Sequence, residues 1–490
     1  MTRSLAPFLR RHQGIAAALL LFGFSIGLQF STRSLGSLDG YFHARYARIV
    51  WDGGVRGFPP AFPWLPLTIR SADRYFDHHM LFHLLLAPFV AGDVLRGAKW
   101  ASAVFGGVAF VAIYLALRRR GVRHAEWWLL AMFALAPDFA FRMEMPRVQA
   151  VSLVWLLLAL DALTARRYWS ALLLAFSYTW LYDAFPFLLA MAGLCALAIA
   201  LIEQRIEWRI VAYPLIGVVV GLVANPYFPN DIWFIAQHYL GKVEIGDSMH
   251  VGSEWYPYPI PQALGWSGAA VVLASAAVLV WRARRELDVA KLTTLLMAGM
   301  FFVLAWRSRR FIEYAAPFAA LGTATTFGET VDRWVRRRSM QHRRALIGLV
   351  LIGFAVSAGY AVVQLRRRKP PERYRGGAHW LSGHTPKDSI VFTADWTDFP
   401  LLFFHNQRNR YLLGLDPTYL ALRDAELYRL WHQLGRGELH PPSAYLPRFD
   451  SRVVFSDRTN VDFLRALDGD PAMQRTYEDD DCVIYTRRDE

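Results

Sequence analysis

Long apolar runs separated by short polar segments fill the first three quarters of the chain. Most runs are close to the length of about 17–25 residues with which a helix crosses a bilayer. The first run has a basic start but lacks a small-residue cleavage site, so we expect a retained span rather than a cleaved signal. The pattern predicts about eleven membrane-spanning helices, at 14–31, 97–117, 126–141, 147–165, 168–182, 185–202, 209–225, 263–281, 289–306, 313–330 and 345–365.

Arginines gather in alternate segments between these runs. The basic segments are the N-terminus and residues 118–124, 165–167, 203–209, 282–286 and 332–344. When the spans are counted in order, these segments share one side of the membrane, which the positive-inside rule makes cytoplasmic. The external side then holds 32–96, the tips near 138–147 and 182–186, 226–262, 306–310 and everything after 365. We therefore expect a multi-pass inner-membrane protein whose site lies among the carboxylates on its external side.

The pattern changes after about residue 370. Residues 418–434 have helical periodicity, and short β-type runs occur at 388–396, 409–415, 451–457 and 482–488. The basic, proline-bearing segment 366–377 has the composition of a linker. The sequence thus predicts an α-helical polytopic membrane domain over 1–365 and a small soluble α/β domain over 366–490, in the periplasm.

Composition supports this class of protein. Of the 490 residues, 54% are hydrophobic and 19% are charged, whereas soluble domains carry about 25% charged residues. The net charge of +14 lies in short loops, so it reports topology and predicts no nucleic-acid partner. The two cysteines belong to no CxxC or His/Cys cluster, so we expect neither a disulfide nor a thiolate metal site. The chain has no nucleotide-binding fingerprint, so no nucleotide cofactor is expected.

The first external segment, "SLDGYFHARYARIVWDGG", is both charged and aromatic. Its apolar residues recur at helical spacing, which predicts an amphipathic helix at the membrane interface; they are Leu38, Phe42, Tyr46 and Ile49. Asp39 and His43 are four residues apart and share a face of this helix. Asp39 is either a functional carboxylate or simply the N-cap, because Asp is a favoured capping residue.

An N-terminal span, the motif "DGYFHARYAR" and the later stretch "LFHLLLAPFVAGDVLRGAKWASAVFGGVAFVAIYLALRRRG" resemble the start of a GT-C glycosyltransferase. Among these enzymes, the three stretches most resemble the catalytic subunit of oligosaccharyltransferases. The resemblance implies that Asp39 is the catalytic carboxylate. It also implies that the donor is a sugar or oligosaccharide carried on a polyprenyl phosphate or pyrophosphate, and that this carrier lies among the membrane lipids. The acceptor would be a glycan, a lipid or a protein.

The stretch "AHWLSGHTPKDSIVFTADWTDFP" resembles the segment that leads into the oligosaccharyltransferase acceptor motif WWDYG. Trp396 and Asp398 match that motif and are implied to recognise the acceptor. Thr397 and Pro400 depart from it, and the loss of the second tryptophan puts recognition of Asn-x-Ser/Thr in doubt. The alternative is an ordinary strand–turn–helix junction, since short motifs often match by chance.

The second external loop departs from the family as well. The family places an acidic pair there that helps hold a divalent metal, whereas this chain has "FRMEMPRVQA", with Arg147 and Gln149 at those positions. Glu144 is the nearby carboxylate, and a site for Mg²⁺ or Mn²⁺ would combine it with Asp39 and waters. Arg142 and Arg147 oppose a cation and suit the donor phosphate instead, so metal dependence stays open.

A third candidate carboxylate is Glu254 in "HVGSEWYPYP". It lies where oligosaccharyltransferases place an external loop whose glutamate touches the acceptor. The alternative is that this proline- and aromatic-rich loop forms an interfacial belt. Asp39, Glu144 and Glu254 are thus the predicted catalytic residues.

Arginines at the outer end of one span break the positive-inside trend; they are Arg307, Arg309 and Arg310. Guanidinium groups hold phosphate bidentately, which favours a donor-phosphate site, and His78 and His79 suit the same role. The alternative is an ion pair of Arg310 with Glu313.

These roles predict a glycosyltransferase in which Asp39 takes a proton from an acceptor hydroxyl, or hydrogen-bonds an acceptor amide. Arginines would offset the charge on the leaving phosphate. A transporter or lipid flippase is the rival interpretation, and it would carry ionisable residues near mid-span. A non-catalytic partner that only binds lipid or protein is the third.

Overall fold

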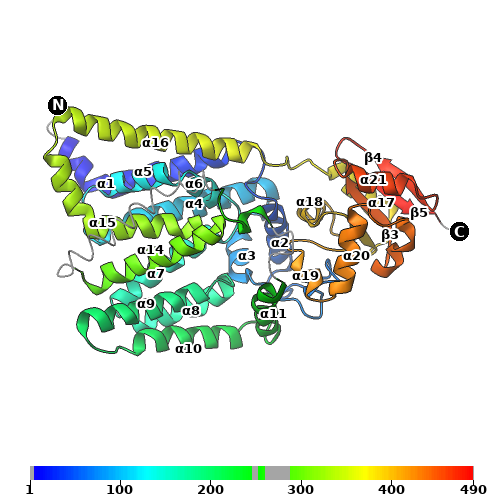
Figure 1. Ribbon diagram of the computed structural model, residues 1–490, viewed down its shortest axis with the longest axis horizontal. Helices are drawn as coiled ribbons and strands as arrows, with labels where there is room; N and C mark the ends of the chain where they lie inside the picture. Colours follow the sequence, from blue (N-terminus) through cyan, green and yellow to red (C-terminus); the bar gives the residue numbers. More distant parts are fainter. Residues whose placement is uncertain (1–4, 246–251, 260–286, 489–490) are drawn as a thin grey trace.

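The computed structural model describes residues 5–245, 252–259 and 287–488. A helical bundle and a small α/β domain lie at opposite ends of the molecule, with α2 and α3 between them (Figure 1). The bundle comprises α1 (Leu5–Gln29), α4 (Val94–Arg119), α5 (Ala125–Leu135), α6 (Pro137–Met143), α7 (Gln149–Thr164), α8 (Tyr168–Leu181), α9 (Pro186–Glu203), α10 (Arg209–Val223), α14 (Val289–Arg307), α15 (Ile312–Arg336) and α16 (Met340–Arg366).

The predicted spans coincide with these helices wherever the structure describes them. One prediction was wrong in detail: 126–141 forms two helices, α5 and α6, because Pro137 follows Ala136 and disfavours helical backbone there. The predicted span 263–281 and the basic segment 282–286 lie outside the described residues. Within the described part, four helices are long and apolar enough to cross a membrane, namely α4, α9, α14 and α16. The total of about eleven crossings stays a prediction.

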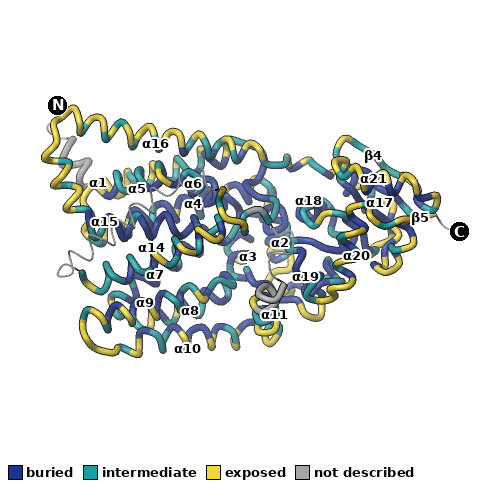
Figure 2. The backbone as a smooth tube through the Cα atoms, viewed as in Figure 1, coloured by how far each residue is buried: buried dark blue, intermediate teal, exposed yellow. Residues whose placement is uncertain are grey.

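Apolar side chains cover the outer faces of two helices of the bundle. Figure 2 shows α16 and α10 exposed along much of their lengths. Soluble proteins rarely expose such continuous apolar surface, so these faces fit contact with lipid. The exposed side chains include Leu215, Ile216, Val219, Val220 and Val223 of α10 and Leu349, Ile352 and Val356 of α16.

Glycines bring α10 close to α8 inside the bundle. Gly217 and Gly221 of α10 are four residues apart, the small-residue spacing typical of packed membrane helices. A β-carbon at Gly217 would lie 2.3 Å from the carbonyl oxygen of Leu172, and one at Gly221 would lie 2.3 Å from Oγ1 of Thr179. Neither helix could pack this closely with larger residues at these positions.

The basic segments that the structure describes between the helices gather at one end of the bundle, as predicted. Arg120 and Asp161 are paired at 2.6 Å, which joins the segment after α4 to the end of α7. Arg166 pairs with Glu203, which joins the α7–α8 and α9–α10 connections. The α9–α10 and α15–α16 connections lie at the end of the bundle away from the α/β domain (Figure 1).

The first external loop contributes α2 (Asp39–Gly53) and α3 (Met80–Leu86). The predicted helix after the first span is confirmed, but its apolar face does not lie free on a membrane surface. Phe42 of α2 packs 5.6 Å from Phe403 of the α/β domain, ring centre to ring centre, and is 2% exposed. Arg45 donates through Nε to the Phe404 carbonyl at 2.8 Å. This helix therefore joins the bundle to the α/β domain.

A five-stranded sheet of order β2-β1-β3-β5-β4 forms the core of the α/β domain. β1 (Ile390–Thr393) runs parallel to β2 (Arg410–Tyr411) and β3 (Ser451–Asp457), while β5 (Cys482–Arg487) runs antiparallel to β3 and β4 (Met473–Glu478). All four predicted strands are present. β4 was missed because its sequence, "MQRTYE", is mostly polar and exposed.

Short helices surround this sheet. The predicted helix at 418–434 is two helices, because Asp424 caps a new helix by accepting the Leu427 N–H. The helices are α17 (Arg375–His384), α18 (Phe399–His405), α19 (Thr418–Ala421), α20 (Ala425–Gly435) and α21 (Val461–Asp468), with 3₁₀ turns η5 (Trp396–Asp398), η6 (Pro442–Ala444) and η7 (Leu446–Phe449). Near the bundle, α11 (Asn230–Ile245), η2 (Ser253–Trp255) and η4 (Arg309–Phe311) complete the described elements.

Candidate functional site

Asp39 is the first residue of α2, and its carboxylate does not cap the helix. Ser37 Oγ accepts the Gly40 N–H at 3.1 Å instead. The carboxylate of Asp39 accepts a 2.5 Å hydrogen bond from Nη2 of Arg147, in the segment before α7. The capping alternative for Asp39 is therefore wrong, and the carboxylate is free to serve a site.

Gly40 makes the contact between these two segments possible. A β-carbon at Gly40 would lie 2.1 Å from Cγ of Pro146, so only glycine lets the ring rest against the start of α2. Arg147 follows Pro146 directly and is thereby placed beside Asp39. The "DG" and "MPR" sequences, far apart in the chain, thus build one corner of the site.

A chain of alternating charges runs on from Asp39. Arg147 donates through Nη1 to Oε2 of Glu254 at 2.8 Å, and the same oxygen accepts from Nη2 of Arg142 at 3.1 Å. Arg142 also donates through Nε to Oε1 of Glu313 at 2.6 Å. Arg142 and Glu313 are 7% and 1% exposed. Each buried charge in this row therefore has an opposite partner, as stability requires.

The electrostatic environment separates the two external carboxylates. Burial raises the pKa of Asp39, and Glu254 adds to the rise while Arg147 opposes it. Burial also acts to raise the pKa of Glu254, but Arg147, Arg142 and Arg310 together hold it well below the usual range. Asp39 is therefore the better proton acceptor of the two.

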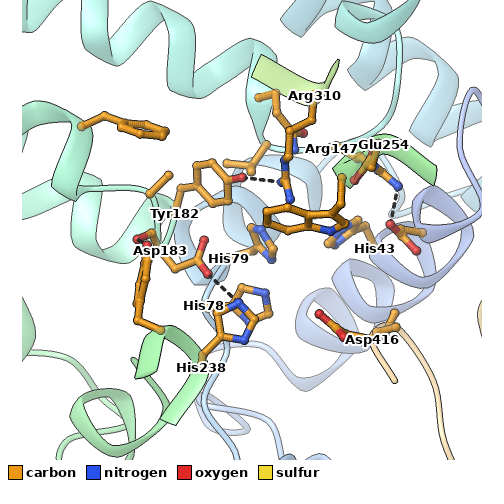
Figure 3. A pocket seen from close by; sticks show the side chains of 18 of the residues that line it. His43, His78, His79, Arg147, Tyr182, Asp183, His238, Glu254, Arg310 and Asp416 are labelled. Carbon is orange, nitrogen blue, oxygen red and sulfur yellow. Dashed lines mark hydrogen bonds and ion pairs between the residues drawn. The ribbon is translucent and has the colours of Figure 1, made fainter. Parts of the chain in front are cut away.

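Two cavities meet at these carboxylates. The histidine cavity, of about 490 Å³, is lined by His43, His78, His79, Tyr182 and Arg310 among others (Figure 3). The domain cavity, of about 590 Å³, lies against the α/β domain and is lined by Arg309, Arg368, Asp395, Trp396 and Thr397 among others. Asp39, Arg147, Glu254, Trp255, Leu415 and Asp416 line both cavities.

Of the three arginines predicted to bind phosphate at the outer end of one span, Arg310 lines the histidine cavity, as does Arg147, the fourth predicted arginine. Nη2 of Arg310 donates to the Tyr182 hydroxyl at 3.0 Å, and the Arg310 guanidinium lies 4.1 Å from the centre of the Trp255 ring. Arg309 instead donates to the carbonyls of residues 256 and 257 and lines the domain cavity. Arg307 is exposed and lines neither cavity. Glu313 pairs with Arg142, so the alternative of an Arg310–Glu313 ion pair is not what the structure shows.

Histidines form a hydrogen-bonded row behind the histidine cavity. Asp77 Oδ2 lies 2.7 Å from Nδ1 of His83, and His83 Nε2 lies 2.8 Å from Nδ1 of His43. Burial lowers the pKa of His43, His78 and His79, and neighbouring histidine and arginine side chains lower it further. These rings are therefore neutral at pH 7 and offer single N–H donors or bare nitrogens rather than charge.

Glu144 is separate from the other predicted carboxylates. Its Oε1 accepts a 2.5 Å hydrogen bond from Ser25 Oγ, and its Oε2 accepts from Gln29 Nε2 at 3.2 Å. It is fully buried between α1 and α4, lines neither cavity, and its pKa is raised by burial. The prediction that Glu144 belongs to the catalytic group is thus at odds with its placement.

The residues present do not fit a divalent cation held by Asp39 and Glu144. The two carboxylates share no hydrogen-bond partner, and Arg147 rather than Glu144 occupies the position against Asp39. Within the described residues, no group of three or more His, Cys, Asp or Glu side chains could hold a metal ion. A hard cation needs several convergent oxygens, which this corner does not offer.

The two residues predicted to recognise the acceptor lie in different surroundings. Trp396 lines the domain cavity. Asp398 points into the α/β domain, where it is 1% exposed and accepts a 2.8 Å hydrogen bond from the Tyr374 hydroxyl. The prediction that Asp398 contacts an acceptor is thus at odds with its placement, because this side chain serves the interior of the domain.

The sequence alone missed several residues of the site. Trp255 and Tyr182 were invisible as partners of Arg310, since their contacts join segments 55 and 128 residues apart. Asp416 and Tyr419 reach the histidine cavity from the α/β domain, over 370 residues from Asp39. Arg70, 1% exposed, contacts the rings of Tyr75 and Tyr419 and Nδ1 of His78. No local pattern marks such residues.

Comparisons with known proteins support a relationship at the level of the fold. No family model matches the chain, and no curated protein matches it. The oligosaccharyltransferase AglB of Archaeoglobus fulgidus, solved with an inhibitory peptide and a dolichol-phosphate, matches with a TM-score of 0.60 and 12% identity. The match covers 92% of this chain and 70% of AglB.

Two further solved structures agree. The Archaeoglobus fulgidus oligosaccharyltransferase in its apo form matches with a TM-score of 0.64 at 13% identity, over 92% of this chain and 70% of that chain. ArnT from Cupriavidus metallidurans, bound to undecaprenyl phosphate, matches with a TM-score of 0.57 at 17% identity, over 96% of this chain and 97% of ArnT. These likenesses extend over most of the chain, which has the fold of the GT-C glycosyltransferases.

Proposed function

We propose that the chain is a membrane glycosyltransferase that moves a sugar or oligosaccharide from a polyprenyl-phosphate-type donor to an acceptor. The observation that carries the proposal is the position of Asp39 where two cavities meet. Of the three described carboxylates that line both cavities, Glu254 holds two arginines and Asp416 is bonded to Thr418. Asp39 holds one arginine, and burial raises its pKa while the arginines around Glu254 lower the pKa of that carboxyl, so Asp39 is the better proton acceptor of these two.

The donor belongs in the histidine cavity under this proposal. AglB was solved with a dolichol-phosphate and ArnT with undecaprenyl phosphate, so both ligands are phosphates of long lipids. Arg310 lies on the wall of this cavity and can give a phosphate the N–H groups that Tyr182 does not take. His78 and His79 would add neutral donors, and Arg147 lies at the junction.

The acceptor belongs in the domain cavity, beside Trp396. An aromatic ring suits the apolar face of a sugar or another ring. A glycan, a lipid or a protein could each bring a hydroxyl to Asp39 from this side. The aspartate side chain is 27% exposed, so a substrate can reach it.

The chemistry follows from this placement. The acceptor oxygen forms a bond to the anomeric carbon, and its proton passes to Asp39. The bond between that carbon and the phosphate oxygen breaks, and the phosphate leaves with the electron pair. Arg310 offsets the charge on the leaving phosphate. The external orientation remains part of the proposal: the N-terminus is cytoplasmic, and the α/β domain lies in the periplasm.

Asp39→Asn tests the proposal. The amide keeps the size of the side chain but cannot take a proton at neutral pH, so transfer from a polyprenyl-linked sugar should fall about 10²–10⁴-fold. Asp52→Asn is the matched control, because Asp52 lies near the other end of α2 and pairs with Arg48 at the surface. Comparable turnover in wild type and Asp39→Asn, with equal thermal stability, would remove Asp39 from the reaction.

A further inference from the structure

Arg147 occupies the space between two carboxylates that face each other across the site. Its Nη2 lies 2.5 Å from Oδ2 of Asp39 and its Nη1 lies 2.8 Å from Oε2 of Glu254. Two carboxylates bridged by one positive group form the arrangement in which a divalent cation is often held. Here the bridge is a side chain of the protein. We propose that Arg147 is a built-in cation of the active site and that the transfer reaction proceeds without a metal ion; this inference rests on the proposed function.

The charges of the described site are already close to balance without a dication. In the row of ion pairs, Asp39, Glu254 and Glu313 are each held by Arg147 or Arg142. The histidine cavity is also lined by Asp183, Asp416, Arg70 and Arg310, so five negative and four positive groups give a formal charge of about minus one. An added Mn²⁺ or Mg²⁺ would reverse this sign in a largely buried site, which is costly.

The available oxygens lead to the same conclusion. Oε2 of Glu254 already accepts from two arginines, and Oε1 of Glu313 accepts from Arg142. Glu144, the other carboxylate in this sequence region, is bonded to Ser25 and Gln29. Oδ1 of Asp39 and the unpaired Oε2 of Glu313 remain, but Glu313 lies at the Arg142 end of the row. A cation held between Asp39 and Glu254 would therefore have to take the place of Arg147 before it could gather its usual six or more oxygens.

A guanidinium in this place has a definite effect on Asp39. It stays protonated at every working pH, and its planar fork fixes the direction of the carboxylate. Because Arg147 holds Oδ2, Oδ1 is the oxygen that receives the acceptor proton. Glu254 acts on the reaction through Arg147, whose second arm it holds, and is therefore a positioning residue rather than a catalytic one.

The test replaces the built-in cation by a metal. Arg147→Ala leaves Asp39 and Glu254 facing an opening, so the variant should bind one Mn²⁺, seen by electron paramagnetic resonance and as a rise in thermal stability with added Mn²⁺. Wild type should show neither. Arg309→Ala is the matched control, since Arg309 lies at the same end of the bundle but bonds to backbone carbonyls. It should bind no Mn²⁺.

Activity supplies the second arm of the test. Wild-type transfer from a polyprenyl-linked sugar should change less than twofold between EDTA and Mn²⁺. Arg147→Ala should lose on the order of 10²–10³-fold in EDTA and regain part of it with Mn²⁺. Arg147→Lys keeps the charge without the fork, and it should stay metal-independent with reduced rate.

Each result decides the inference. A wild type that stops in EDTA and recovers with Mg²⁺ or Mn²⁺ would overturn it, as would stoichiometric Mn²⁺ binding by wild type at the site or an Arg147→Ala variant that binds no more Mn²⁺ than wild type. A wild type without transfer under any condition would reject the proposed function instead, and the Mn²⁺-binding arm would then decide the inference alone.

Discussion

The guanidinium of Arg310 lies 4.1 Å from the centre of the Trp255 indole ring. A hydrogen bond from Nη2 to the Tyr182 hydroxyl fixes the same group from the side. An arginine held flat in this way keeps its remaining N–H groups directed at a fixed place, here the histidine cavity. Such an arrangement suits a phosphate, which accepts two parallel hydrogen bonds.

Arg310→Lys should therefore weaken donor binding on the order of tenfold, because lysine keeps the charge but loses the fork and much of the ring contact. Binding of a polyprenyl phosphate to the purified protein measures this directly. Arg307→Lys is the control, since Arg307 is exposed and lines neither cavity. Equal affinity in wild type and Arg310→Lys would assign the phosphate to other residues.

The Gly40–Pro146 contact gives a second prediction. Alanine at position 40 would place its methyl group 2.1 Å from Cγ of Pro146. The two segments must then separate, which costs about 1–3 kcal/mol in stability, as overpacking usually does. The same shift moves Arg147 off Asp39, so we expect at least a tenfold loss of transfer in a protein that still folds.

Gly53→Ala provides the control for this variant. Gly53 ends the same helix, and nothing lies within 4 Å of a β-carbon built there. Its alanine variant should be as active and as stable as wild type. A Gly40→Ala protein with full activity would show that the contact with Pro146 does not position Arg147.

Much of the fold could be predicted from the sequence because each element is marked locally. Apolar length marks the spans, arginines mark one end of the bundle, and β-branched runs mark β1, β3 and β5. The errors fall where local signals compete or are weak. Pro137 splits a run that is apolar throughout, and β4 is a polar strand that gains its place only by pairing with β5.

The site was only partly predictable, since contacts between distant segments decide it. Asp39, Arg147, Glu254 and Arg310 were each marked by type and by position near a span end, and the structure brings them together. Glu144 has the same marks, yet it turns toward α1 and α4, because Ser25 and Gln29 offer hydrogen bonds there. Only the packing of helices distinguishes these cases.

Orientation in the membrane is a third prediction. The basic connections share one end of the bundle, and the α/β domain lies at the other (Figure 1). The positive-inside rule then places residue 120 in the cytoplasm and residue 400 outside. Reporter fusions at these two residues check it. An external signal at 120 or a cytoplasmic signal at 400 would place the proposed site on the wrong side of the membrane for an external transferase.

The last prediction concerns Asp398 in the α/β domain. Its Oδ1 accepts from the Tyr374 hydroxyl, and its Oδ2 is buried without a hydrogen-bond partner. Burial, with help from Asp395, raises the pKa of Asp398 to about 8. In the unfolded chain this carboxyl titrates near its ordinary value of about 3.9.

A raised carboxyl pKa fixes the sign of the pH effect. The folded domain prefers the neutral acid, so its stability is fully present below about pH 4 and is lost as pH rises toward about 8, at up to about 1.4 kcal/mol per pH unit. Asp457 does not mask this trend. Burial raises its pKa, but side-chain and backbone hydrogen bonds outweigh burial and lower it, so the stability that Asp457 contributes is lost only below about pH 4.

Asp398→Asn resembles the neutral acid. Its stability should match that of wild type near pH 4 and exceed that of wild type at pH 8. Hydrogen exchange in β3 and β5 reports the stability of this domain, and Asp480→Asn, at an exposed position between β4 and β5, is the control. A wild-type stability that stays level between pH 4 and 8, or an Asp398→Asn variant with the same slope as wild type, would show that Asp398 is ionised in the folded domain.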